Sequence, residues 1–203
     1  MPNRGAYDRQ TIHDIVDAGI LCHVGYVVDG QPYVTPTAHW RIGDSLYWHG
    51  SSASRMLRAQ FAGVPVCVTV TLVDGIVFAR SAFHHSMNYR SVMAVGTAEA
   101  VVDAEQKRAA LRAFVERLAP GRWPQIRPPT PTELKATMIM RLSLDEASAK
   151  VRCGPSVEDE ADYALPCWAG VLPLCVRAGA SQPDPRLSPG IPEPEQLGAL
   201  RLG

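Results

Sequence analysis

Several features that mark other protein classes are missing from this chain of 203 residues. No apolar run is long enough to span a bilayer, and the amino-terminal MPNRGAYDRQ is polar, which argues against a signal peptide. Twenty basic residues balance twenty acidic ones, so the chain has no net charge with which to attract nucleic acid or an anionic membrane. We therefore expect a cytoplasmic protein that acts on a small molecule, with no nucleic-acid or membrane partner.

Motifs for metal binding and for common catalytic sites are missing too. The five cysteines are scattered, without a CxxC pair, and are predicted to be reduced, mostly buried thiols. His84 and His85 are adjacent, so they could share a metal only from a loop, and no metal site is predicted. The chain also lacks GxGxxG, GxxxxGK(S/T), GxSxG and HExxH, which disfavours Rossmann, kinase-like, hydrolase and zincin chemistry.

Short strand patterns separated by turn residues dominate what is present. Ile20–Val28 and Gln31–Trp40 flank Asp29-Gly30, a strong hairpin signal. Val64–Leu72 is nearly continuous in β-branched residues, which predicts a strand buried on both faces, and Asp74-Gly75 predicts the next reversal. The other expected elements are helices at Asp8–Ala18 and Asp103–Leu118, a loop at Ala119–Thr132, and strands at Ile76–Arg80, Tyr89–Val102 and Thr137–Leu144.

The stretch Asp44–Arg58, DSLYWHGSSASRMLR, changes from a strand pattern to a helix pattern across a small, hydroxyl-rich turn. Residues 50–54 supply small side chains, hydroxyls and the free N–H groups of a helix start. Arg55 and Arg58 add positive charge in the first helical turn, which is mildly unfavourable unless an anion lies there. The arrangement suggests a phosphate site, and an ordinary strand-to-helix junction with a serine cap is the alternative.

The number of short strands and the small number of helices favour a mainly β protein. We expect an antiparallel β-barrel with peripheral helices, formed as one domain by residues 1–176. Residues 177–203 are rich in proline and almost free of aromatics. That composition predicts a flexible tail, either disordered or lying over a partner subunit.

Five segments in a particular order and spacing resemble a known family. They are PYVTPTAHW, LYWHGSSASRM, NYRSVMAVGTAEAV, ASAKVRCGPSVEDEAD and PCWAGVLPL. Their combination is similar to the FMN-binding split-barrel superfamily of pyridoxamine 5′-phosphate oxidase-related proteins, in particular the flavin-nucleotide-binding branch that includes nitroimidazole-resistance proteins. The resemblance covers Tyr7–Leu174 and implies an antiparallel split barrel, an FMN cofactor and a homodimer with flavin at the subunit interface.

The resemblance also implies which residues contact FMN. The serine-rich turn would hold the phosphate, and Met56 stands where the oxidases have a lysine, so Arg58 or a partner residue would replace that cation. The implied cofactor contacts are Ser51, Ser54 and Arg55 on the phosphate, Gly50 in the same turn, Thr35, Pro36, Thr37 and His49 along the isoalloxazine ring, Arg90 and Ser91 from a neighbouring strand, and Trp168 as a cover.

The resemblance leaves the activity open among three classes. The oxidases carry a basic run near their carboxyl end, where this chain has the apolar Val171–Val176. The leading hypothesis is therefore an FMN-dependent oxidoreductase of unassigned small-molecule substrate, for example of nitroreductase type, whose flavin carries the redox chemistry. The alternatives are a deazaflavin-dependent reductase on the same fold and a non-catalytic flavin- or haem-binding protein, for which the candidate haem ligands are His39, His49, His84 and His85.

Overall fold

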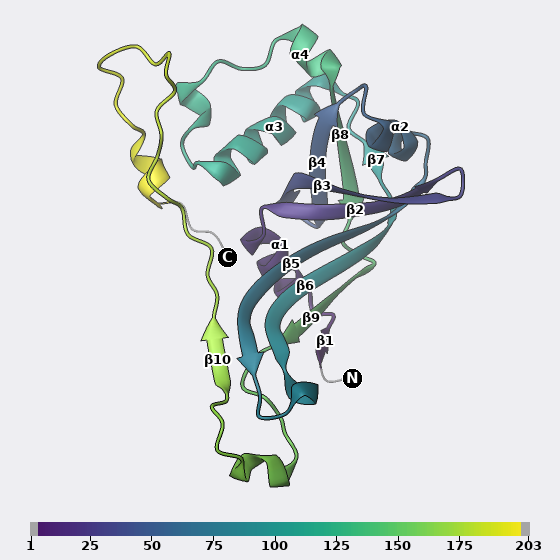
Figure 1. Cartoon of the computed structure of the whole chain (residues 1–203). Coiled ribbons are helices and arrows are strands. Elements are labelled where there is room, and N and C mark those ends of the chain that lie inside the picture. The colour runs from purple at the N-terminus through teal and green to yellow at the C-terminus, as the bar shows by residue number, and fades with distance from the viewer. Residues whose placement is uncertain (1–3, 200–203) are drawn as a thin grey trace.

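The computed structural model describes residues 4–199, which are built around one antiparallel sheet (Figure 1). The strand order is β1-β9-β6-β5-β2-β3-β4-β8-β7, with β10 added along β5. The strands of the described chain are β1 (Gly5–Ala6), β2 (Leu21–Val28), β3 (Gln31–Ile42), β4 (Ser45–Ser51), β5 (Pro65–Phe78), β6 (Ser86–Thr97), β7 (Glu99–Ala100), β8 (Thr137–Ser143), β9 (Ala147–Arg152) and β10 (Gly170–Pro173).

Three of the α-helices gather at one end of the molecule, whereas α1 packs against the sheet (Figure 1). None of the helices described here combines the length and the apolar character needed to cross a bilayer. The helices and helical turns are α1 (Arg9–Ala18), α2 (Arg55–Phe61), η2 (Ala82–His84), α3 (Ala104–Leu118), η3 (Trp123–Gln125), α4 (Pro131–Ala136), η4 (Glu160–Ala164) and η5 (Glu195–Ala199).

The sheet curls into an open barrel because one continuous stretch of chain, residues 86–100, pairs with strands in two different parts of the sheet. β6 pairs with β5 and β9, and after Ala98 the chain continues as β7, which pairs with β8. A cavity of about 490 Å³ lies between β6 and β8, lined in part by Thr97 and Arg141. The predicted antiparallel split barrel with peripheral helices is confirmed.

The barrel interior is filled by alternating apolar side chains and closed by α1. Val24, Val68 and Trp48 are buried in one cluster with Ile12 and Val16 of α1. Removing these side chains from water is the main favourable term in folding, at about 25 cal/mol per Å² of apolar surface. The amphipathic pattern predicted for Asp8–Ala18 thus corresponds to a helix that faces the core.

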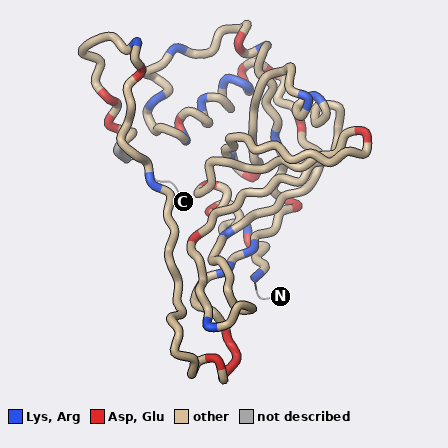
Figure 2. Tube along the Cα trace, in the orientation of Figure 1, with Lys and Arg blue, Asp and Glu red and all other residues tan. Residues whose placement is uncertain are grey.

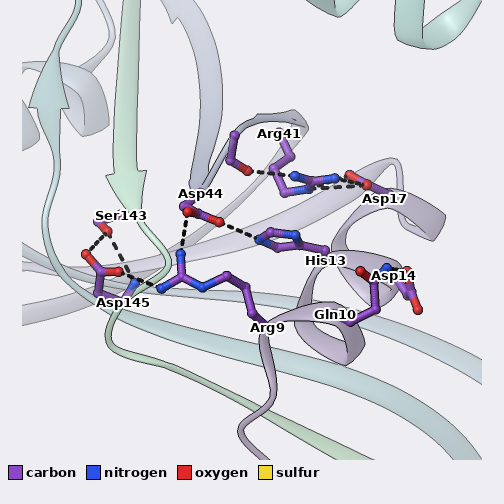
Figure 3. A network of polar contacts seen from close by, with 10 residues as sticks. Arg9, Gln10, His13, Asp14, Asp17, Arg41, Asp44, Ser143 and Asp145 are labelled. Carbon is purple, nitrogen blue, oxygen red and sulfur yellow. Dashed lines mark hydrogen bonds and ion pairs between the residues drawn. The ribbon is translucent and has the colours of Figure 1, made fainter.

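Charged side chains tie α1 to two turns of the sheet (Figure 3). Arg9 forms ion pairs with Asp44 in the β3–β4 turn and with Asp145 in the β8–β9 turn, where Nη2 and Oδ1 are 3.2 Å apart. His13 Nε2 lies 2.9 Å from Asp44 Oδ1. Because these groups are largely exposed, each pair adds little free energy, and their combined effect is to orient α1.

Strand β3 changes its partner at His39, which is buried and clamped. Residues 31–38 pair with β2, and residues 39–42 pair with β4. His39 Nε2 donates to the Val16 carbonyl of α1 over 2.9 Å, and Arg117 of α3 donates to the Asp17 carbonyl over 2.8 Å and to the His39 carbonyl over 3.3 Å. These bonds satisfy the carbonyls at the end of α1 and hold α1, β3 and α3 together.

The reversal predicted at Asp74-Gly75 is wrong. β5 continues from Pro65 to Phe78 as one long strand, and the ladder with β6 shifts register between Val73 and Gly75. A bulge therefore absorbs the local turn signal. Gly75 is needed there for a different reason, because a Cβ on it would lie 3.0 Å from the Leu172 carbonyl oxygen of β10.

The prediction that Val64–Leu72 is buried on both faces is wrong for the single chain. Val66, Val68 and Val70 are buried, whereas Cys67 and Thr69 on the other face are only half-buried. The described chain supplies a second layer for one face of this strand only. A β-branched run on a half-covered strand leaves apolar surface for another molecule to cover.

The prediction that the cysteines are mostly buried is also wrong. All five are free thiols, but only Cys22 is buried, where burial raises its pKa to about 12. Cys153, Cys167 and Cys175 are exposed. These three lie after the end of β9, in segments that run over the surface and have no second layer above them.

The carboxy-terminal segment leaves the sheet after β10 and runs toward α3 (Figure 1). The Leu174 amide donates to the Asp74 carbonyl over 3.0 Å. Farther on, Leu187 and Ile191 line a cavity of about 360 Å³ together with Arg122. The flexibility of residues 177–203 and the domain boundary at 176 stay predictions, and residues 200–203 lie outside the described part.

The first prediction concerns the pH dependence of stability through His39. Burial lowers the pKa of His39 to about 4, whereas an exposed histidine titrates near about 6.5. Below pH 6.5 His39 binds a proton in the unfolded chain but stays neutral in the folded chain. The free energy of unfolding therefore falls as the pH is lowered toward 4. Between pH 7 and pH 5, urea unfolding should show the wild type losing about 2 kcal/mol more than His39→Gln. His23→Gln, which changes an exposed ring on β2, should keep the wild-type loss; equal losses for wild type and His39→Gln would contradict this account.

Candidate functional site

The hydroxyl-rich turn between β4 and α2 is held by backbone hydrogen bonds. The Ser52 amide donates to the Ala136 carbonyl over 2.8 Å, and the Ser54 amide donates to the Ser51 carbonyl over 2.9 Å. The Ala53 amide donates to Ser51 Oγ over 3.2 Å. The turn is therefore fixed to the end of α4, and Ser54 caps α2 by backbone conformation without a side-chain hydrogen bond.

The two arginines at the start of α2 have different roles. Arg58 Nε donates to the Ser52 carbonyl over 3.1 Å, so this side chain closes the turn. Arg55 instead places its guanidinium carbon 4.2 Å from the centroid of the Tyr33 ring on β3. Neither arginine has a carboxylate partner within the described residues, and both are exposed. Figure 2 shows their charge as blue at α2, beside largely uncharged strands.

The positive charge of this turn comes mainly from side chains. α2 has seven residues, about two turns, so the aligned peptide dipoles behind its amino-terminal end are few. Guanidinium groups carry a full charge and can donate two parallel hydrogen bonds to one phosphate. Arg55 is the residue whose guanidinium is free for that contact.

The predicted ring contacts lie on β3 and β4, the two strands that precede the turn. Thr35 and Thr37 are half-buried on the same face as Tyr33, whereas Pro36 is exposed on the opposite face. His49 lies with its ring centroid 4.9 Å from that of Phe114, and burial lowers the pKa of His49, which keeps the imidazole neutral. Its Nδ1 is buried without a hydrogen-bond partner in the described structure.

Gly50 lies where α2 approaches β4 closely. A Cβ at this position would meet Leu57 Cδ1 at 3.1 Å, so the glycine allows the helix to pack near the strand. Beneath the helix, Trp48 Nε1 donates to Gln60 Oε1 over 2.9 Å inside the core. Gln60 therefore sets the position of α2 and, through it, of the turn.

The other predicted contacts lie away from the turn in the single chain. Arg90 on β6 is bonded to Asp74 by a pair of hydrogen bonds of 2.7 and 3.0 Å, and Ser91 Oγ donates weakly to the Lys150 carbonyl over 3.4 Å. Trp168, 71% exposed, packs on Phe78 next to β10. β10 and α2 are at opposite ends of the molecule (Figure 1). One chain thus places Arg55 of α2 against β3, beside the turn that contains Gly50, whereas His49 packs toward α3 and the contacts from β6 and Trp168 lie elsewhere.

Three features of the structure were missed in the sequence. Tyr33 supports Arg55, and its place two residues before Thr35 on the same strand face was the available signal. Near β10, His85 packs edge-on against Phe78 with centroids 6.0 Å apart, which no local pattern indicated. His84, Asp159 and Asp162 also bring ligand-type atoms within 4.8 Å of one another, a grouping that depends on a long-range contact.

Comparison with known proteins places the chain in a family. The family described as pyridoxamine 5′-phosphate oxidase matches residues 8–151, and the chain belongs to it. The flavocytochrome Anf3 from Azotobacter vinelandii is 48% identical, with a TM-score of 0.94, and the match covers 98% of this chain and 92% of that one. An FAD- and haem-binding protein from Mycobacterium smegmatis is 36% identical, with a TM-score of 0.93 and coverages of 98% and 97%.

A more distant structure agrees with the branch that the sequence indicated. The structure of a protein from Bacteroides thetaiotaomicron, named as a putative 5-nitroimidazole antibiotic resistance protein, is similar. It is 25% identical, with a TM-score of 0.59. That match covers 72% of this chain and 86% of the other. Among curated proteins, no sequence matches this chain.

The second prediction tests the support beneath the turn. Gln60→Leu leaves Trp48 Nε1 as a buried, unpaired donor but also removes the buried, unpaired Nε2 of Gln60, so we expect a loss of about 1 kcal/mol of unfolding free energy, the lower end of the range for an unpaired donor. Gln106→Leu on the exposed surface of α3 is the control and should change stability by less than about 0.5 kcal/mol. Urea titrations followed by tryptophan fluorescence measure both; a Gln60→Leu protein as stable as the control would refute the role given to this bond.

Proposed function

We propose that the chain is a flavin-binding protein that holds the flavin phosphate at the turn between Ser51 and Arg58. The observation that carries the proposal is the guanidinium of Arg55, which is exposed, supported by Tyr33 and free of a carboxylate among residues 4–199. A phosphate beside it would accept charge-assisted hydrogen bonds from Arg55 and from the hydroxyls of Ser51 and Ser54. Membership of the family and the flavin named for two relatives support this assignment.

The cofactor that we propose is FMN, with FAD as the alternative. Both flavins present the same phosphate next to the ribityl chain, so the turn suits either. The relative from Mycobacterium smegmatis is named for FAD, which favours testing both. A deazaflavin cofactor, which also carries a phosphate, stays a third option.

We propose flavin-dependent oxidation or reduction of a small molecule as the activity. When bound, the flavin supplies hydride or electron transfer, and the protein supplies binding and orientation. In this chain Arg55 would bind the phosphate, Thr35 and Thr37 would offer hydroxyls along the ring, and neutral His49 would offer Nδ1. Nitroreductase-type chemistry is one such activity, supported by the nitroimidazole-resistance relative.

A second candidate function is the combined binding of flavin and haem. It is supported by the relatives at 48% and 36% identity, a flavocytochrome and a protein that binds FAD and haem. The described chain also carries His85, an exposed histidine on an aromatic surface, which is a suitable donor for haem iron. With this second function the protein would transfer electrons between the flavin and the haem, or store electrons on them.

We also propose that two copies associate through the uncovered face of the sheet. Val34, Gly25, Cys67 and Val95 are cross-strand partners in a row over β3, β2, β5 and β6, and none carries a charge. Val34 is 67% exposed. A second copy would cover this outer sheet face and could bring its own Arg90, Ser91 and Trp168 toward the turn.

The third prediction tests the phosphate contact. Arg55→Ala should weaken binding of FMN and of FAD about 10- to 100-fold, the scale of a hydrogen bond to a charged group at about 1.5–3 kcal/mol. Quenching of flavin fluorescence measures the affinity. Arg127→Ala is the control, because Arg127 carries the same charge but is already paired with Glu133 at 2.6 Å. This variant should leave the flavin affinity unchanged. If the wild type binds neither flavin, the proposed function is refuted. If Arg55→Ala keeps the wild-type affinity, flavin binding stands but the phosphate does not bind at Arg55.

The fourth prediction tests the second copy. Sedimentation velocity should give twice the chain mass for the wild type and the single-chain mass for Val34→Arg, because a charge in the middle of an apolar interface is costly to desolvate. Val102→Arg is the matched control, since Val102 is 74% exposed but lies outside the outer sheet face. A monomeric wild type, or a dimeric Val34→Arg with unchanged affinity, would refute this interface.

A further inference from the structure

The surface between β5, β6 and β10 carries an aromatic patch around His85, which we define as Phe78, His85 and Trp168. Phe78 lies between the other rings, with centroids 6.0 Å from His85 and 5.8 Å from Trp168. Trp168 is 71% exposed. Exposed aromatic surface of this kind is unfavourable in water and marks a place where another group binds.

One hydrogen bond decides which nitrogen of His85 is free. Its Nδ1 lies 2.9 Å from the Ser81 carbonyl oxygen. A carbonyl can only accept, so Nδ1 carries the proton, and in the neutral ring Nε2 keeps its lone pair. A backbone acceptor that fixes the tautomer and ring orientation is the usual arrangement behind a metal-bound histidine.

The other histidines of the described chain are less suited to bind iron. His39 is buried with Nε2 bonded to Val16, and His49 is half-buried against Trp40 and Phe114. His13 faces the Asp44 carboxylate, and His84 faces Asp159 with Nε2 3.9 Å from Oδ2. His23 is exposed on the outer sheet face, where the described chain supplies no aromatic partner for it.

The wall beside His85 is held in place by the end of β5. Phe78 pairs with Gly170 at the first position of the β5–β10 ladder. A Cβ at Gly170 would lie 2.9 Å from Cζ2 of Trp168, so the glycine lets the indole pack against β10. The patch thus offers exposed apolar rings, tilted by 56° in the Phe78–Trp168 pair, next to a nitrogen donor, and a porphyrin could contact these rings while the nitrogen holds its iron.

We propose that His85 Nε2 is the axial ligand of a haem that lies on this aromatic patch. The inference rests on the second candidate function, combined flavin and haem binding, and names the residue that would hold the iron. On binding, the Nε2 lone pair forms a coordinate bond to ferric iron and a water ligand leaves. Iron keeps its oxidation state, and no proton is released because Nε2 carries none.

The test titrates the full chain with hemin and follows the Soret band and the ferric EPR spectrum. His85→Gly should weaken hemin binding at least as much as loss of a group behind a metal ligand, about 10- to 100-fold. Adding free imidazole should restore the wild-type spectra by filling the space left by the ring. His85→Cys should bind hemin with the EPR spectrum of a thiolate ligand, which shows directly that this position reaches the iron.

Two matched variants separate His85 from its neighbours. His84→Gly changes the adjacent ring, and His23→Gly changes another exposed ring, so both should keep the wild-type hemin affinity and spectra. The same samples are also titrated with FMN, so that a specific loss of hemin binding can be distinguished from a general loss of ligand binding; within one chain Arg55 lies at the other end of the molecule from β10 (Figure 1).

The outcomes distinguish the ligand from the function. If the wild type binds no hemin at micromolar concentration, the haem function fails and this assignment fails with it, while flavin binding is judged by its own titration. If the wild type binds hemin and His85→Gly keeps its affinity and spectra, haem binding stands and His85 is not the ligand. Loss of binding in His84→Gly or His23→Gly alone would likewise reassign the ligand.

Discussion

The change of partner along β3 is the constraint on which the rest of the structure depends. Its first eight residues belong to the ladder with β2, and from His39 onward it pairs with β4. A strand can serve two partners only if the switch point is held, and here His39 and Arg117 hold it through the carbonyls at the end of α1. β4 therefore continues the sheet beyond β3 in a fixed direction, and the turn before α2 follows at its end. The turn is distant in sequence from Arg117 and depends on it for orientation.

The candidate site is divided in a way that has a physical explanation. The turn, β3 and β4 lie together, while Arg90, Ser91 and Trp168 belong to strands on another side of the barrel. The face between them is a row of uncharged side chains, half-covered in one chain. Association of two copies would cover that face and complete the set of flavin contacts in one step.

Sequence patterns were most successful where one local rule acted without competition. The helix at Asp8–Ala18, the hairpin at Asp29-Gly30 and the strand-to-helix change after Gly50 were predicted close to their observed bounds. The rule failed at Asp74-Gly75, because a long ladder with β6 and the bond between Arg90 and Asp74 outweighed the preference for a turn. The cysteine prediction failed because average burial says nothing about a segment that lacks a covering layer. The family resemblance supplied Arg90, Ser91 and Trp168, which no periodicity connects to the turn.

By itself the sequence determined the class of fold and the chemistry available at the turn between β4 and α2. Alternation, turn residues and hydroxyl-rich spacing are local properties, so they can be recognised without knowing what packs against them. Only the tertiary structure decided that Arg58 is used within the turn while Arg55 stays free, and that His85 keeps Nε2 available beside Phe78. These outcomes depend on which groups meet across β3, β5 and β10. The free energy of such contacts is set by distance and burial in space, which the order of residues along the chain does not display.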